Sequence, residues 1–239
     1  MRLASLAILI VLAVPVALFA LTRGPERRAD PRPTTTAPPP PEATTAPEPP
    51  AATPRPEPTP LPRTRRPPSR AVGLPWNGRL VDGHPLPVRG PGYETWDPIR
   101  KQVPNRGWRR WGTGRLVRIV ERVVATYARR HPNAPPVLVG DLSRPRGGDF
   151  GPRFGGIGHA SHQNGLDADV YYPRLDGRLR RAARPDQVDR AAAQELVDAF
   201  VREGAQYVFV GPSLGLRGPR KVVQVLTHHD DHLHLRLRG

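Results

Sequence analysis

The sequence contains no cysteine, so it offers neither a disulfide framework nor thiolate ligands for a metal. Any bound metal must therefore be held by histidine and carboxylate side chains. Hydrophobic residues are also few, at 37% of the chain, because a proline-rich stretch in the first third dilutes them. From about Val72 onward the apolar content is that of an ordinary core, so we expect one folded domain.

Acidic residues are scarce: 21 Asp and Glu stand against 37 Lys and Arg, which gives a formal net charge of +16. Arginine carries almost all of this excess, and it is spread along the chain instead of forming one basic block. No recognisable nucleic-acid-binding module accompanies the charge, so we expect no nucleic-acid partner. A diffuse positive field would equally hold the protein near anionic polymers or lipid headgroups.

The longest apolar run extends from Leu3 to Leu21 and is long enough to span a hydrocarbon core of about 30 Å. Residues 1–28 are therefore predicted to be a signal anchor or a signal peptide. The end of the run, ALFAL, is a poor cleavage site, which favours an uncleaved membrane anchor. Arginines follow this run, and by the positive-inside rule they favour a cytoplasmic position, which opposes an outward placement of the rest of the chain.

Residues 29–70 consist mainly of Pro, Thr, Ala, Glu and Arg, and have no apolar periodicity. Such a segment cannot bury enough surface to offset its ordering entropy, so it is predicted to be a disordered, extended linker. A linker of this kind would let a folded domain at residues 71–239 act at a distance from the bilayer.

The folded part mixes helical and strand patterns. Apolar residues at helical spacing from Leu116 to Tyr127 predict one helix, and a second is expected from Pro185 to Gly204. Strands are expected at 137–139, 207–210, 222–226 and 232–237. Because these elements follow no regular βαβ order, we expect an α+β fold with a small, mostly antiparallel sheet and flanking helices.

Most of the eight histidines lie in two short segments, 158–169 and 228–234, that are also rich in aspartate. A catalytic zinc needs three protein ligands and one open position. The first segment can supply His162 and Asp169, because a turn at Gly165 would let a loop residue and a strand residue converge. His234 can supply the third ligand from the last strand.

Two further side chains are expected beside this metal. Strict alternation in the last strand places His232 on the same face as His234, which is the position of a general acid/base or of a group that stabilises an oxyanion. Asp167 is interpreted as a partner that orients one of the histidines.

Three sequence blocks carry a resemblance to a known family: GDLSRPRGG (140–148), GHASHQNGLDADVYY (158–172) and HDDHLHLRL (229–237). They resemble the motifs of the penicillin-insensitive murein endopeptidases, within the wider group of lysostaphin-type, D-Ala-D-Ala and hedgehog-type metallopeptidases. The resemblance covers roughly residues 71–239. After the second block the family can carry an acidic residue paired with a histidine, and this chain has no histidine there. The resemblance therefore does not imply a second bound metal.

The resemblance implies a role for each histidine of the two segments' motifs. His162, Asp169 and His234 would be the zinc ligands, and His232 would be the catalytic histidine. His159 and His229 match two further active-site histidines, so we expect them to take part in catalysis.

The expected function is therefore a zinc-dependent murein endopeptidase that hydrolyses peptide cross-links between the stem peptides of peptidoglycan. Two alternatives stay open: a D-Ala-D-Ala carboxypeptidase of the same group, and a wall-binding module without turnover. The expected location is outside the cytoplasm, with the domain held to the membrane by the N-terminal segment, or secreted if that segment is cleaved.

Overall fold

The computed structural model describes residues 68–154 and 159–239. The membrane segment predicted at 1–28 and nearly all of the predicted linker at 29–70 lie outside the described residues. Within the described ranges, no helix combines the length and the apolar character that a membrane crossing requires.

The first predicted helix is confirmed as α1, Gly114–Arg130. Thr113 precedes it with extended backbone angles, and its Oγ1 accepts a hydrogen bond from the backbone N–H of Leu116 at 3.2 Å. A side-chain oxygen at this position satisfies a donor that the first turn leaves unpaired. The residues at helical spacing from Leu116 to Tyr127 are buried, as the pattern predicted.

The second helix is confirmed, but its predicted start is wrong. Pro185 opens a separate 3₁₀ turn, Pro185–Gln187, and the chain is extended again at Val188. α2 spans Arg190–Arg202, and the carboxylate of Asp189 caps it by accepting from the backbone N–H of Ala192 at 3.0 Å. Val188 is buried, and its backbone bridges to Arg174. This tertiary contact, together with the Asp189 cap, explains why the helix starts five residues later than the proline suggested.

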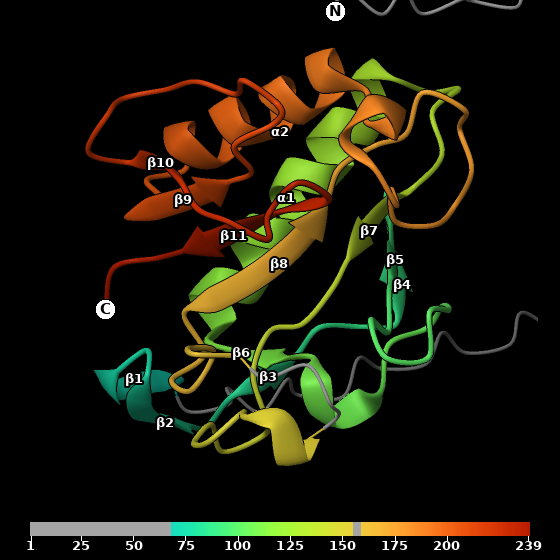
Figure 1. Ribbon diagram of the computed structural model, residues 1–239. Helices are drawn as coiled ribbons and strands as arrows, with labels where there is room; N and C mark the ends of the chain where they lie inside the picture. Colours follow the sequence, from blue (N-terminus) through green and yellow to red (C-terminus); the bar gives the residue numbers. More distant parts are fainter. Residues whose placement is uncertain (1–67, 155–158) are drawn as a thin grey trace, which may run out of the picture. The chain divides into compact units, whose positions relative to one another are not determined.

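A seven-stranded sheet forms the centre of the fold, in the order β10-β9-β11-β8-β7-β5-β4 (Figure 1). Neighbouring strands are antiparallel except for the pairs β10–β9 and β5–β7, so the mostly antiparallel sheet is confirmed. The strands are β4 (Arg89–Gly90), β5 (Tyr93–Thr95), β7 (Val137–Val139), β8 (Asp167–Tyr171), β9 (Tyr207–Val210), β10 (Val223–Val225) and β11 (His232–Arg236).

The two faces of the central strands differ in chemistry. Leu233 and Leu235 of β11, with Ala168 and Val170 of β8, are fully buried in the main hydrophobic cluster together with both helices. Figure 1 shows α1 passing behind β8. The alternate residues of the same two strands face away from that core, and they include the polar residues singled out in the sequence.

Two small two-stranded sheets complete the described part of the chain. β1 (Arg70–Leu74) pairs with β2 (Asn77–Val81), and β3 (His84–Pro85) pairs with β6 (Trp111–Gly112). The β1–β2 hairpin packs on the loop that begins at residue 140, where Gly147 has a φ of 68° and a Cβ would lie 2.0 Å from the carbonyl oxygen of Gln163. Only glycine fits there, so the hairpin and the histidine-bearing loop are held together.

Candidate metal centre

The register of β8 against β11 builds one row of polar side chains on the open face of the sheet. Three cross-strand pairs follow one another: Asp167 with Arg236, Asp169 with His234, and Tyr171 with His232. Opposite residues in an antiparallel pair have Cβ atoms about 4.5–5.5 Å apart. The strand pairing itself therefore brings the two distant sequence motifs into contact.

His162 reaches the same face from the loop before β8. Gly165 takes a φ of 77°, as the predicted glycine turn requires, and His162 itself lies in the left-handed region at 67°. A non-glycine residue in this region is uncommon, and the surrounding contacts must hold it there. Its backbone N–H donates to Asp167 Oδ2 at 2.9 Å, and its ring Nδ1 donates to the carbonyl of Leu142. The second ring nitrogen, Nε2, is thereby left with a free lone pair.

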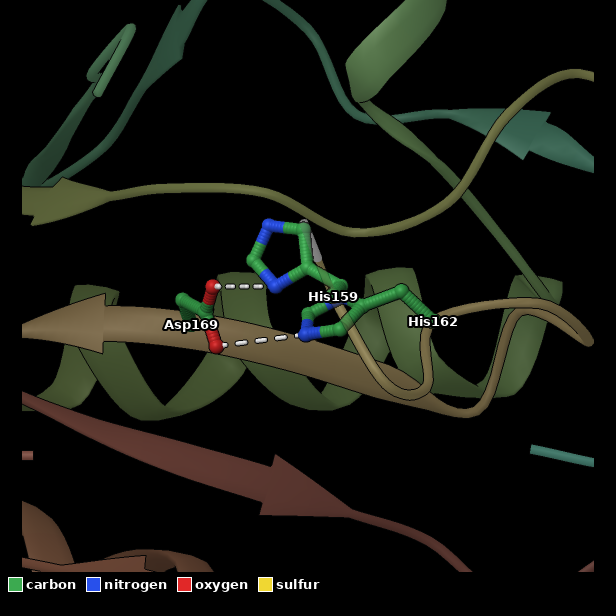
Figure 2. Close-up of side chains that lie close together, drawn as sticks. All are labelled: His159, His162 and Asp169. Atoms are coloured by element: carbon green, nitrogen blue, oxygen red, sulfur yellow. Dashed lines mark ion pairs between the residues drawn. The ribbon is translucent and has the colours of Figure 1, made fainter. Parts of the chain in front are cut away.

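Two imidazoles converge on one carboxylate oxygen. His162 Nε2 and His234 Nδ1 each lie 3.3 Å from Asp169 Oδ1, and Figure 2 shows the contact from His162. Both His162 Nε2 and Asp169 Oδ1 are buried, and neither makes a hydrogen bond within the part of the chain that the structure describes. Buried polar atoms are rarely left unpaired. Two nitrogen ligands and one oxygen ligand aimed at a common point fit a zinc ion.

Asp167 orients His234 from behind. His234 Nε2 donates to Asp167 Oδ1 at 3.1 Å, which leaves Nδ1 to face Asp169. Arg236 Nε donates to the same oxygen at 2.6 Å. A carboxylate that fixes the tautomer of a metal-binding histidine is a general feature of such sites, and it agrees with the interpretation of Asp167 made from the sequence.

The charges of the cluster suit metal ligation. Although burial raises it, the neighbouring imidazoles hold the pKa of Asp169 well below its usual value, so the carboxylate is ionised. Burial lowers the pKa of His162, which favours the neutral ring that a metal needs. His234 lies between two carboxylates, and these outweigh its burial and raise its pKa to about 9.

His159 also belongs to this cluster. It forms, with His162 and Asp169, a group whose potential ligand atoms lie within 4.8 Å of one another. Its Nδ1 is 3.9 Å from Asp169 Oδ2, the second contact drawn in Figure 2, and its Nε2 hydrogen-bonds to Asp141 Oδ2 at 2.8 Å. Asp141 is buried and paired with the guanidinium of Arg109. His159 is therefore a fourth potential ligand beside the predicted three.

His232 and His229 lie at the edge of the cluster. His232 Nδ1 hydrogen-bonds to Asp231 Oδ1 at 2.6 Å, while its Nε2 lies 3.9 Å from Asp169 Oδ1. Asp231 is held in turn by Arg181 at 2.7 Å. The ring of His229 lies 4.7 Å from that of His232, centroid to centroid. All seven residues singled out in the sequence, Asp167 included, thus lie close together.

Two pockets open at this site, and both are lined by His159 and His229. The polar pocket, of about 320 Å³, is lined among others by Lys101, Asp169, Tyr171, Arg181, Asp231 and His232. The aromatic pocket, of about 380 Å³, is lined among others by Trp76, Ser161, Phe209, Leu226, His234 and Arg236. Of the candidate ligands, Asp169 thus lines the polar pocket and His234 lines the aromatic pocket.

Sequence reasoning missed several members of the site. Asp141 stands inside the quoted GDLSRPRGG block, and Tyr171 stands two residues after Asp169, so strand alternation offered a signal for the tyrosine. Trp76, on the turn between β1 and β2, and Arg109 lie far from the motifs in sequence, and no pattern indicated them. Only the packing of the described segments brings these two residues to the site.

Comparison with known proteins agrees with this geometry. A model of the family described as penicillin-insensitive murein endopeptidase matches residues 71–209, which is more than half of the chain. The chain belongs to this family. The match includes His162 and Asp169 but ends before β11, so the third candidate ligand, His234, rests on the geometry and on the quoted motif.

Individual penicillin-insensitive murein endopeptidases show the same relationship. The one from Klebsiella pneumoniae is 32% identical over 128 residues, which cover 52% of this chain and 41% of the relative. The one from Salmonella heidelberg is 28% identical over 197 residues, 71% of this chain and 66% of the relative. The one from Haemophilus influenzae is 36% identical over 100 residues, 42% and 30% of the two chains. The chain thus spans less than two thirds of these relatives.

Proposed function

We propose that this protein is a zinc-dependent murein endopeptidase that hydrolyses peptide cross-links of peptidoglycan. The observation that carries the proposal is the pair of buried atoms without hydrogen bonds, His162 Nε2 and Asp169 Oδ1, to which His234 Nδ1 adds a third ligand atom. Family membership supports the reaction class and the substrate. The family name of the relatives refers to murein, the cross-linked polymer of the bacterial wall.

Bound zinc would supply Lewis-acid chemistry toward water and the scissile carbonyl. The chain's own residues would hold the ion and handle the protons. His162, Asp169 and His234 are the proposed ligands, and Asp167 fixes the orientation of His234. His232, oriented by Asp231, has its Nε2 free on the side of the polar pocket, where it can take a proton from water and give one to the leaving amine.

His159 and His229 line both pockets and are proposed to assist in catalysis. His159 is placed by its hydrogen bond to Asp141 and by stacking on Phe150, with ring centroids 5.0 Å apart. Its Nδ1 faces Asp169, so it can contact either the metal or the reacting carbonyl. His229 donates its Nδ1 to the carbonyl of Thr227 at 2.7 Å, which directs its other nitrogen away from that loop.

The two pockets favour an endopeptidase over a carboxypeptidase. An enzyme that removes one terminal residue needs a closed space on one side of the metal, whereas a cross-link has peptide on both sides of the scissile bond. Here a cavity of about 320 Å³ is lined by Asp169, and a second cavity of about 380 Å³ is lined by His234. A module without turnover is disfavoured because His232 and its orienting carboxylate accompany all three ligands.

Mass spectrometry of purified peptidoglycan digested by the full-length protein tests the function. Cross-linked dimeric muropeptides should decrease and monomers increase, and a chelator should stop the reaction. Release of D-alanine from uncross-linked pentapeptide stems, with dimers unchanged, would support the carboxypeptidase instead. Binding to the wall without any change in muropeptides would support the module without turnover.

We further propose that residues 1–28 hold the protein in the membrane and that the domain acts outside the cytoplasm. The apolar run, the proline-rich stretch and the wall substrate of the relatives support this placement. A reporter enzyme that is active only outside the cytoplasm should work when it is joined after Arg70. Activity of a cytoplasm-only reporter at the same position would overturn the topology.

A further inference from the structure

Tyr171 occupies the polar pocket at the same level as the proposed general base. It follows Asp169 by two residues on β8, on the same face of the sheet, and it pairs with His232 across β11. The two rings lie 5.5 Å apart, centroid to centroid. Both residues line the polar pocket together with Asp169.

The ring of Tyr171 is held firmly in place. It packs edge-to-face against Trp96, with centroids 6.4 Å apart and planes at 71°, and it clusters with Leu138. Gly140 leaves the space for it, because a Cβ at that position would lie 2.9 Å from Tyr171 Cε2. Only 6% of Tyr171 is exposed, so its ring is positioned before any substrate arrives.

The hydroxyl of Tyr171 is a donor without a described partner. Within residues 68–154 and 159–239, no hydrogen bond joins it to another residue. The hydroxyl can therefore donate a hydrogen bond to a group that enters the polar pocket.

We propose that Tyr171 is a catalytic residue whose hydroxyl donates a hydrogen bond to the carbonyl oxygen of the scissile amide as negative charge develops there. This inference rests on the proposed peptidase function. Donors fixed where charge appears in the transition state act without reorganisation, and a tyrosine hydroxyl is one of the groups that serve this purpose. The packing of the Tyr171 ring does not require its hydroxyl oxygen.

The reaction balances without transfer of the tyrosine proton. The oxygen of water adds to the carbonyl carbon, and the carbonyl electron pair moves to the carbonyl oxygen, which accepts the hydrogen bond from Tyr171. His232 takes a proton from the attacking water and passes it to the amide nitrogen. The pair on oxygen then re-forms the carbonyl, the C–N bond breaks, and a carboxylic acid and an amine are released.

Steady-state hydrolysis of soluble dimeric muropeptides by the full-length Tyr171→Phe variant tests the proposal. The change removes one oxygen and keeps the ring. We expect kcat to fall by about 10²–10³-fold, as for other lost oxyanion donors, with KM close to that of the parent protein. Zinc content and melting temperature should match the parent. Tyr172→Phe is the matched control, because Tyr172 is the next residue, lies in the main hydrophobic cluster and does not line the polar pocket.

Each outcome separates the inference from the function on which it rests. Parent-like kcat in Tyr171→Phe would overturn the proposal while leaving the peptidase intact. A raised KM with unchanged kcat would also overturn it, since it would assign the hydroxyl to ground-state binding. If the parent protein itself does not convert dimers, the proposed function fails first. Loss of activity in Tyr172→Phe to the same extent would show a general packing effect and contradict a specific donor.

Discussion

Replacement of His162 by alanine should remove most of the zinc from the purified protein, and with it the hydrolysis of cross-links. The ring nitrogen lost in this variant is buried, has no hydrogen bond within the described ranges, and lies 3.3 Å from Asp169 Oδ1. With a ligand gone, a three-ligand site cannot keep its geometry. We expect the same result for Asp169→Ala and His234→Ala, measured as metal per chain by elemental analysis after dialysis.

His131→Ala provides the matched control for these variants. His131 ends α1 and hydrogen-bonds to Glu195 at 2.7 Å, away from the cluster, so its loss should leave one zinc per chain. Circular dichroism shows whether each variant is folded. If folded variants at all three positions kept the zinc content of the parent, the ligand assignment would be wrong.

Asp167→Asn should have a smaller effect on zinc binding than the loss of a ligand. The amide keeps the shape of the side chain but removes the charge that orients His234 and pairs with Arg236. Loss of such an orienting partner weakens metal binding by about 10–100-fold. Zinc affinity measured by competition with a chelator should therefore fall in Asp167→Asn, but by less than in the variants that lack a ligand.

Replacement of His232 by alanine should leave zinc bound and reduce turnover by about 10²–10⁴-fold, as expected for a positioned proton-transfer group. Its Nε2 is 3.9 Å from Asp169 Oδ1, farther than the 3.3 Å of His162 and His234, and its Nδ1 is occupied by Asp231. The measurement is conversion of dimeric muropeptides into monomers at matched zinc content. The carboxylate of Asp231 and Arg181 would remain to line the polar pocket in this variant.

His229→Ala serves as the comparison for His232→Ala. Its ring lies beside that of His232 and is partly buried in the loop before β11. It should therefore matter less if it only orients the site, and comparably if it shares the proton transfer. Loss of zinc in His232→Ala would mean that the roles of His232 and His234 are exchanged. Full activity in His232→Ala would exclude the proposed mechanism.

Local patterns in the sequence predicted the elements that carry the site. Helical spacing from Leu116 to Tyr127 and alternation from His232 onward correspond to α1 and β11, because periodic burial of apolar side chains is a local property of an amphipathic segment. The start of α2 predicted from Pro185 was wrong. Proline favours the first turn of a helix only where the chain can continue as a helix, and here Val188 is held in an extended conformation by tertiary contacts.

The sequence by itself determined which side chains are candidates for the site. The absence of cysteine restricted the ligands to imidazole and carboxylate, and the motifs named His162, Asp169 and His234. The tertiary structure decided how these groups are oriented and what surrounds them. The register of β8 against β11 joins motifs that are more than sixty residues apart, and packing brings Trp76 and Arg109 beside them. Contacts between distant segments depend on how whole elements pack, so no local pattern records them.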